Sequence, residues 1–221
     1  MPTSDHNNIN SILTIVTNLR PRRLLDIGCG FGKYGVLLRE YLDIWNERIE
    51  SESWNLNLTG IEAFGRYRNP IHDYVYDAVH FCEAQQILPT LGEFDVVLIA
   101  DVIEHLEMER ARDLVSECLR HSPVVVISTP IEFYPQQALC GNPYEIHRNL
   151  FTKKDFPPDV HVHCQRMVSC NIYVASREPL NPSVFALSDP ADYVYLRSRM
   201  KLGKWGLPLS ICLKLLCRLA A

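Results

Sequence analysis

The feature that most constrains this chain is the stretch at residues 24–32, which reads LLDIGCGFG. A short apolar segment with one acidic residue runs into three glycines spaced two positions apart, and residues 33–41 follow with apolar side chains at helical spacing. Glycine permits a tight turn and lets the backbone approach a ligand, and the start of a helix offers N–H groups that have no partner within the helix. The stretch therefore predicts a strand, a ligand-binding turn and a helix.

The spacing of the glycines distinguishes two kinds of nucleotide-binding turn. A dinucleotide-binding turn reads G-x-G-x-x-G, whereas here Gly28, Gly30 and Gly32 alternate with other residues. With Asp26 two positions before the first glycine, the arrangement resembles motif I of the class I S-adenosylmethionine-dependent methyltransferases, D/E-x-G-x-G-x-G, at every position. The resemblance implies that these four residues bind S-adenosylmethionine, whose ammonium and sulfonium groups favour a nearby carboxylate. The alternative is a glycine-rich turn with a purely structural role.

The remainder of the chain alternates between strand-like and helix-like patterns. The clearest strand is residues 94–100, which is nearly continuously apolar, as a buried parallel strand should be. Over about residues 9–176 the order of elements resembles that of the same methyltransferases. It implies an α/β, Rossmann-like, doubly wound sheet of seven mostly parallel strands with an antiparallel edge strand. We predict strands at 23–27, 56–61, 79–82, 94–100, 124–128, 160–166 and 170–175, helices at 9–19, 33–41 and 110–120, a loop at 43–55, a loop and short helix broken by Pro70 at 66–76, and an irregular insertion at 131–158.

Length and charge predict one domain followed by a basic tail. The 221 residues, 47% of them hydrophobic, suit a single α/β domain, which we place at 1–176 as a class I methyltransferase domain. The tail at 177–221 is basic and partly amphipathic. From position 193 onward it has six basic and no acidic residues, and removing these from the net charge of −4 leaves −10 on residues 1–192. Residues 204–220 combine basic side chains, a tryptophan and an apolar run, which is typical of a helix at a membrane surface. The alternative is a helix packed on the domain or on the partner in a homodimer.

Acidic residues follow three of the predicted strands, at positions where the resembling family binds its cofactor. Glu62 ends the second strand, and there the family's acidic residue accepts hydrogen bonds from both ribose hydroxyls. Glu83 follows the third strand and is implied to lie against the adenine, and Asp101 follows the strongest strand in the place of the family's motif IV. Taken alone, each of these residues would be interpreted as a solvated charge at the end of a strand.

The candidates for acid–base chemistry are histidines near the expected methyl donor. Asp101, Glu104 and His105 stand at i, i+3 and i+4, so they share one face if a helix opens there. An imidazole titrates near neutral pH, which makes His105 the leading general base and His147, in the insertion, the second. The alternative is that Glu104 and His105 only stabilise the start of the helix and brace the loop.

A metal centre is the less favoured interpretation of the same residues. The D-x-x-E-H pattern with a later histidine is similar to the divalent-metal site of the 3′-terminal small-RNA 2′-O-methyltransferases and of the ubiquinone-pathway O-methyltransferases. The RNA enzymes have glutamate where this chain has aspartate, so we expect no metal. His161 and His163 alternate along a predicted edge strand, which is more typical of exposed histidines than of a second metal site. The ligands that the resemblance implies are Asp101, Glu104, His105 and His147.

These features predict an S-adenosylmethionine-dependent methyltransferase that modifies a small-molecule or lipid-linked acceptor at oxygen and releases S-adenosylhomocysteine. An acidic body disfavours a nucleic-acid partner. Two alternatives stay open: an RNA 2′-O-methyltransferase with a divalent metal site, and a non-catalytic binding module with this fold. Eight cysteines without a C-x-x-C pair, the absence of a signal-peptide pattern and the absence of an apolar run of about 18 residues predict a cytoplasmic protein, with peripheral membrane contact through its tail.

Overall fold

The computed structural model describes residues 6–186. The chain divides into two compact units, Met1–Leu180 and Asn181–Ala221, and the first contains all the strands and α-helices reported below. The predicted membrane-contact segment at 204–220 lies outside the described residues, so membrane and dimer contacts stay predictions. No helix within residues 6–186 is long and apolar enough to cross a membrane.

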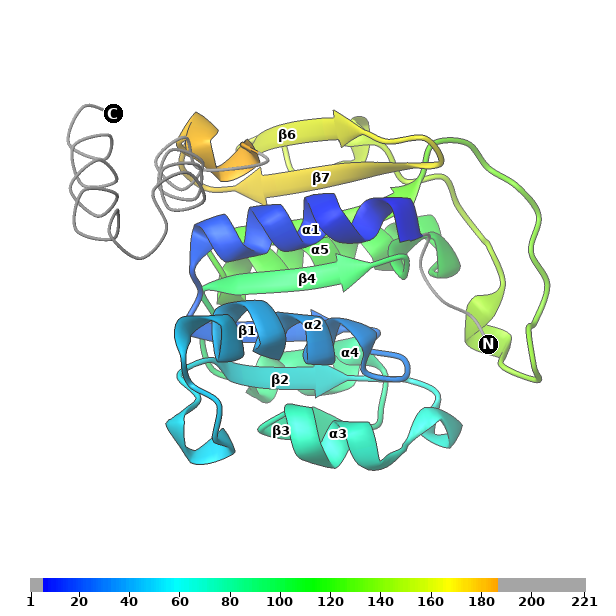
Figure 1. Ribbon diagram of the computed structural model, residues 1–221. Coiled ribbons are helices and arrows are strands. Elements are labelled where there is room, and N and C mark those ends of the chain that lie inside the picture. Colours follow the sequence, from blue (N-terminus) through cyan, green and yellow to red (C-terminus); the bar gives the residue numbers. More distant parts are fainter. Residues whose placement is uncertain (1–5, 187–221) are drawn as a thin grey trace. The chain divides into compact units, whose positions relative to one another are not determined.

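The sheet has seven strands: β1 (Arg23–Ile27), β2 (Asn57–Ile61), β3 (Ala78–His80), β4 (Val96–Ala100), β5 (Val124–Pro130), β6 (His161–Arg166) and β7 (Cys170–Ser176). Their order is β3-β2-β1-β4-β5-β7-β6 (Figure 1). β1 to β5 pair in parallel, and β7 is antiparallel to both β5 and β6. The predicted mostly parallel, doubly wound sheet is confirmed, with β7 as the reversed strand between β5 and the edge strand β6.

Helices cover both faces of the sheet. The α-helices are α1 (His6–Leu19), α2 (Lys33–Leu42), α3 (Pro70–Val75), α4 (Ala84–Ile87) and α5 (Met108–His121). Figure 1 shows α1 and α2 in front of the sheet and α5 behind it. The 3-10 helices are η1 (Ile44–Asn46), η2 (Ser51–Ser53), η3 (Gly65–Tyr67), η4 (Leu88–Thr90), η5 (Ile103–His105), η6 (Pro143–Glu145), η7 (Lys153–Asp155) and η8 (Pro182–Phe185).

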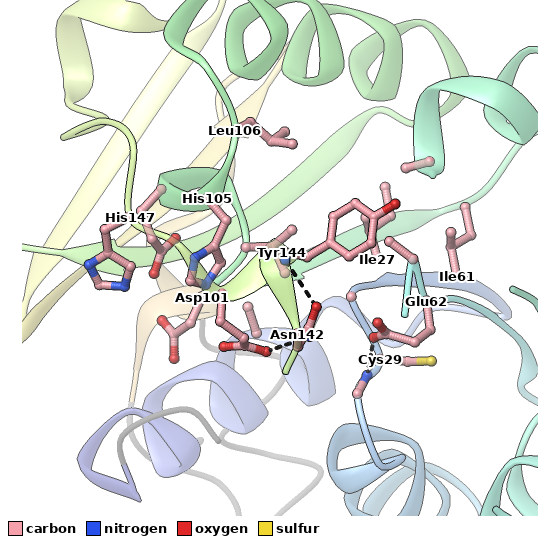
Figure 2. Close-up of a pocket in the computed structure, with 18 of the residues that line it drawn as sticks. Ile27, Cys29, Ile61, Glu62, Asp101, His105, Leu106, Asn142, Tyr144 and His147 are labelled. Atoms are coloured by element: carbon pink, nitrogen blue, oxygen red, sulfur yellow. Dashed lines mark hydrogen bonds between the residues drawn. The ribbon is translucent and has the colours of Figure 1, made fainter. Parts of the chain in front are cut away.

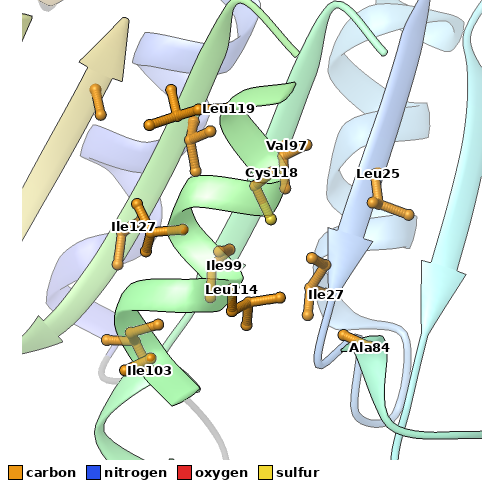
Figure 3. Close-up of a cluster of buried hydrophobic side chains, with 14 of the residues drawn as sticks. Leu25, Ile27, Ala84, Val97, Ile99, Ile103, Leu114, Cys118, Leu119 and Ile127 are labelled. Atoms are coloured by element: carbon orange, nitrogen blue, oxygen red, sulfur yellow. The ribbon is translucent and has the colours of Figure 1, made fainter. Parts of the chain in front are cut away.

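The core explains why the central strands are apolar along their whole length. Successive side chains of a strand point to opposite faces of the sheet, and all five residues of β4 are buried. On one face, Val97 and Ile99 pack in a cluster with Leu114 and Cys118 of α5 (Figure 3). Because helices cover both faces, both sets of strand side chains must be apolar.

The start of α3 corrects one expectation. Pro70 does not break a helix but begins it: Asn69 is the N-cap, and its side chain accepts a hydrogen bond from the backbone N–H of Ile71 at 2.8 Å. The first residues of a helix have no intrahelical partner for their N–H groups, so a proline costs nothing there. Asn-Pro was therefore a helix-start signal rather than a breaker.

A buried guanidinium ties α2 to its neighbours. Arg39 is 3% exposed, donates to the carbonyl oxygen of Val75 at 2.7 Å, and pairs with Asp43 at 3.0 Å and Asp77 at 2.7 Å. Asp43 in turn accepts the backbone N–H of Asn55 at 2.7 Å. The predicted loop at 43–55 thus contains the two short helices η1 and η2 and is anchored through a charge that is fully paired.

Candidate functional site

The glycine turn that follows β1 has a backbone that only glycine adopts freely. Gly28, Gly30 and Gly32 have φ angles of +74°, +56° and +89°. A Cβ atom at Gly28 would lie 2.2 Å from a methyl carbon of Val102, whereas one at Gly30 would meet nothing closer than 3.9 Å. Gly28 is therefore required for packing, while the backbone of Gly30 faces open space that a ligand can occupy.

Glu62, directly after β2, binds the backbone of this turn. Its Oε2 accepts the backbone N–H of Gly30 at 2.9 Å and its Oε1 accepts that of Phe64 at 2.8 Å. Burial raises the pKa of the carboxyl group, and the two backbone donors oppose that shift. Each carboxylate oxygen retains a second lone pair, so Glu62 can still accept hydrogen bonds from the hydroxyls of a ligand.

Asp26 lies behind the turn and is not part of the cavity lining. It is 1% exposed, and the hydroxyl of Tyr76 donates to its Oδ2 at 2.7 Å. Burial raises the pKa of Asp26 to about 7, which outweighs the lowering effect of the Tyr76 hydrogen bond. Gly32 is also absent from the lining. Direct contact of Asp26 or Gly32 with a cofactor stays a prediction.

One large cavity runs along the carboxyl edge of the sheet. Its volume is about 1140 Å³, above the range of about 300–1,000 Å³ usual for a pocket that holds one small ligand. One end is formed by residues 28–31, Glu62 and residues 82–85, and the other by residues 100–102, residues 104–107 and part of the insertion. Figure 2 shows Glu62 and Cys29 at one side, His105 and His147 at the other, and Asn142 and Tyr144 between them. The cavity has room for a nucleoside cofactor together with an acceptor.

Two of the predicted cofactor residues line this cavity with their carboxylates already engaged. Glu83 pairs with Arg110 at the rim and accepts the hydroxyl of Tyr144 at 3.3 Å. Asp101 has a left-handed backbone, with φ +54°, and accepts the hydroxyl of Ser128 at 2.6 Å. Both lie in the cavity, and their contact with a cofactor stays a prediction.

The segment after β4 differs from the expected helix start. Ile103–His105 is a single 3-10 turn, and Asp101 is outside it with its left-handed backbone, so the expected shared helix face of Asp101, Glu104 and His105 is wrong. The third member of the cluster, His147, comes from the insertion at 131–158. Ligand atoms of Glu104, His105 and His147 all lie within 4.8 Å of one another. The two imidazole rings are 5.0 Å apart between centroids.

Backbone carbonyl groups surround both histidines. The Nδ1 of His147 is 3.0 Å from the carbonyl oxygen of Tyr134, and a carbonyl only accepts, so this Nδ1 carries the hydrogen and Nε2 carries a lone pair. The Nδ1 of His105 is 3.4 Å from the carbonyl oxygen of Ile146, and the carbonyl groups of Asp101 and Glu145 also act on this ring. The tautomer of His105 that donates from Nδ1 to Ile146 is the one that leaves Nε2 unprotonated for a proton or a metal ion.

Burial disfavours the charged forms of His105 and Glu104. Burial, and then the neighbouring His147, lower the pKa of His105 to about 4. Burial, and then the charge of Asp101, raise the pKa of Glu104 far above its usual value. The Oε2 of Glu104 is buried without a hydrogen bond of normal length within residues 6–186, and its polar neighbour is the hydroxyl of Thr129, which opposes the rise in the pKa of Glu104. Burial thus disfavours the charged form of Glu104 as well as that of His105.

The other histidine pair lies elsewhere. His161 and His163 are exposed on the edge strand β6. In residues 6–186, Glu104, His105 and His147 form the only group of such side chains close enough to share a metal ion. The interpretation of His161 and His163 as exposed strand histidines agrees with this placement.

Polar contacts that the sequence did not indicate hold the insertion across the cavity. Asn142 is 1% exposed and donates to the hydroxyl of Tyr67 at 3.1 Å and to Glu145 at 3.1 Å. Tyr67 also stacks on Phe31 of the glycine turn, with ring centroids 4.5 Å apart. The one local signal was Asn142-Pro143, because an asparagine before proline caps a short helix, here η6.

The strand order β3-β2-β1-β4-β5-β7-β6, with β7 antiparallel, is the fold of the class I S-adenosylmethionine-dependent methyltransferases. Comparison with solved structures agrees. The bifunctional kinase-methyltransferase WbdD matches with a TM-score of 0.58 and 14% identity over 88% of this chain. This chain spans only 46% of that protein.

Two other solved structures match over most of their own length. The N-terminal domain of EvdMO1, solved with S-adenosylhomocysteine bound, has a TM-score of 0.52 and 15% identity over 80% of this chain and 83% of its own. Magnesium protoporphyrin IX methyltransferase (ChlM) from Synechocystis PCC 6803, solved with S-adenosylmethionine bound, has a TM-score of 0.51 and 15% identity over 77% of each chain. At such identities the likeness shows the fold alone. No family model and no curated protein matches the sequence.

Proposed function

We propose that this protein is an S-adenosylmethionine-dependent methyltransferase that transfers the methyl group to an oxygen atom of a small-molecule or lipid-linked acceptor. The observation that carries the proposal is the single cavity at the carboxyl edge, which joins the glycine turn and Glu62 at one end to Glu104, His105 and His147 at the other. A cofactor and an acceptor bound there would meet near the middle.

The cofactor end has groups suited to a nucleoside with a charged sulfonium. A ligand can contact the backbone directly at the open side of Gly30. The remaining lone pairs of Glu62 suit the two ribose hydroxyls. The lining of the whole cavity carries six acidic side chains; burial disfavours the charge of Glu104, and the carboxylates among the other five favour a cationic cofactor electrostatically. EvdMO1 and ChlM were solved with the product and the substrate form of this cofactor, which supports the same assignment here.

The acceptor end has groups suited to removing a proton from a hydroxyl. The methyl group of a sulfonium is already electrophilic, so the protein must hold the nucleophile in line with it, at about 3 Å. An acceptor oxygen has to lose its proton during transfer. His105 is neutral at physiological pH because its pKa is about 4, and its Nε2 is the proton acceptor that we propose. His147 presents a second Nε2 beside it.

The charge of the lining supports a small acceptor rather than RNA. Six Asp or Glu side chains line the cavity, against three Lys or Arg. Two of the three cations, Arg110 and Arg148, are paired with Glu83 and Glu107. A nucleic-acid site needs surplus positive charge near the reacting group to bind phosphates. The apolar side chains of Leu106 and Leu139 line the cavity as well.

A specific observation favours a second proposal, that the cluster holds a divalent cation. The buried Oε2 of Glu104, without a hydrogen bond of normal length within residues 6–186, and the Nε2 atoms of the two histidines form a donor set that suits a metal ion. Glu104, His105 and His147 would hold the ion, and Asp101 is not part of the cluster. A bound cation would supply positive charge that lowers the pKa of an acceptor hydroxyl.

The decisive experiment is transfer of a radiolabelled methyl group from S-adenosylmethionine into fractionated cell extract. We expect label in the lipid or small-molecule pool, insensitive to RNase. Label confined to RNA would refute the acceptor class, and binding of S-adenosylmethionine by calorimetry without transfer into any pool would indicate a non-catalytic module. Loss of label after EDTA, restored by added Mn²⁺ or Zn²⁺, is expected from the second proposal, and unchanged activity in EDTA would refute it.

A further inference from the structure

We propose that Asn149 is a positioning residue that holds the Glu104–His105 turn against His147. The inference rests on the proposed function of this cluster, because it concerns how the cluster is assembled. Asn149 lies two residues after His147, is 7% exposed, and does not line the cavity. It acts on the reacting groups only through the backbone that carries them.

The turn that carries Glu104 and His105 has little support of its own. Ile103–His105 is three residues long, and within it two backbone hydrogen bonds close the turn, one of them stretched to 3.4 Å between Leu106 and Ile103. The chain is extended at Leu106, with φ −89° and ψ 156°. A segment this short does not hold its shape through helical cooperativity, so external contacts must position it.

Asn149 and its neighbour supply these contacts. The side-chain Nδ2 of Asn149 donates to the carbonyl oxygen of Ile103 at 2.8 Å and to that of Leu106 at 2.7 Å, one at each end of the turn. The backbone N–H groups of Arg148 and Asn149 both donate to the carbonyl oxygen of Glu104, at 2.8 and 3.2 Å. Four hydrogen bonds from two consecutive residues therefore meet three of the four carbonyl groups of residues 103–106, the segment that carries Glu104 and His105.

The segment at residues 146–151 also positions the other half of the cluster. It contains His147, and the carbonyl oxygen of Ile146 accepts from Nδ1 of His105. Phe151 anchors this segment, because it is fully buried in the core and packs edge-on against Phe156 at 5.1 Å between ring centroids. The segment carries His147 and binds the backbone of the turn that carries His105. The side-chain amide of Asn149 therefore fixes the separation of the two rings.

Two substitutions test this role at asparagines whose amides each bridge two carbonyl groups, Asn149, which is buried, and Asn46, which is exposed. Asn149→Asp keeps the shape of the side chain but removes the N–H donors and sets a carboxylate against two carbonyl oxygens. Asn46→Asp makes the same change where the asparagine Nδ2 bridges the carbonyl oxygens of Tyr41 and Leu42, outside the cavity. Both variants lose an amide that joins two carbonyl groups, and only the first should disturb the cluster.

The first readout is independent of methyl transfer. In the full-length protein with ¹⁵N-labelled histidine, assigned by single His→Gln variants, the rings of His105 and His147 should show a mutual NOE and the Nδ1–H tautomer. We expect Asn149→Asp to lose both signatures, and Asn46→Asp to retain them. If Asn149→Asp keeps both signatures, the positioning role is wrong. This test gives its result even if the wild-type protein transfers no methyl group.

The second readout applies to methyl transfer. A displacement of about 1 Å at reacting groups costs on the order of 10²-fold in rate, so Asn149→Asp should lower kcat about 100-fold while KM for S-adenosylmethionine stays within about twofold. Asn149→Ser, which restores one donor, should recover part of kcat. An equal loss of kcat in Asn46→Asp, or no loss in Asn149→Asp, would overturn the proposal.

Discussion

Replacing Asp26 by asparagine should make the protein more stable, and increasingly so as the pH rises. The carboxyl group is 1% exposed and its pKa is raised from 3.8 to about 7, chiefly by burial. An asparagine has nearly the same shape, and its amide oxygen can still accept the hydrogen bond from Tyr76. The substitution therefore removes the buried charge while keeping the neutral contact.

The two pKa values determine the size and the sign of the effect. Because the folded-state pKa of Asp26 is higher than the unfolded value, its contribution to stability is fully present below pH 3.8 and is lost as the pH rises through 7. Each pKa unit corresponds to about 1.4 kcal/mol. The difference in unfolding free energy between Asp26→Asn and the wild type should therefore grow by about 1.4 kcal/mol per pH unit and level off near 4 kcal/mol above pH 7.

Urea denaturation of both proteins at pH 5, 6, 7 and 8 measures this difference. Comparing the two proteins cancels the contributions of Glu104 and His105, whose pKa shifts do not involve Asp26; Glu62 does act on Asp26, so the difference reports Asp26 together with this interaction. A difference that stays constant between pH 5 and 8 would refute the argument that Asp26 is protonated by burial. The separate prediction that Asp26 binds the cofactor requires at least tenfold weaker binding of S-adenosylmethionine by the same variant.

Three further predictions follow from single sites. Arg39→Met should cost more than about 2 kcal/mol in chemical denaturation, because the carbonyl oxygens of Val75 and Leu56 lose a buried charged donor while Asp43 keeps its pair with Arg48. Arg120→Met, at an exposed pair, should cost less than about 1 kcal/mol. Glu62→Gln should weaken S-adenosylmethionine binding at least tenfold by calorimetry, since hydrogen bonds to a charged group are worth about 1.5–3 kcal/mol; unchanged affinity would remove Glu62 from the cofactor site. Gly28→Ala should lower the unfolding free energy by more than about 2 kcal/mol through backbone strain and the clash with Val102, whereas Gly65→Ala, which has open space, should stay within about 1 kcal/mol in the same assay.

Much of the fold was predictable because it depends on patterns that are local in the chain. The apolar run of β4 and the alternate glycines after β1 each indicate their own structure. The misjudged elements were short. Pro70 was interpreted as a breaker although it begins α3, and residues 103–105 form one 3-10 turn rather than a helix start. In such short segments, caps and contacts from distant residues outweigh intrinsic preference.

The candidate site was predictable in its members but not in its arrangement. Glu62, Glu83 and Asp101 could be placed at one edge because parallel strands end together. Asp26 lies behind the glycine turn and contacts Tyr76. This placement depends on which side chains fill the space beneath the glycines, and no residue spacing in the sequence indicates it.

By itself, the sequence determined a strand, a glycine turn and a helix, and with them a class of fold. The reason is that backbone stereochemistry and the period of apolar residues act between near neighbours. The resemblance had grouped His147 with Asp101, Glu104 and His105, and only the tertiary structure decided that Asp101 lies outside the cluster of the other three. An insertion more than 40 residues away brings His147 across the cavity, and its position depends on hydrogen bonds to backbone carbonyl groups that every residue type possesses equally.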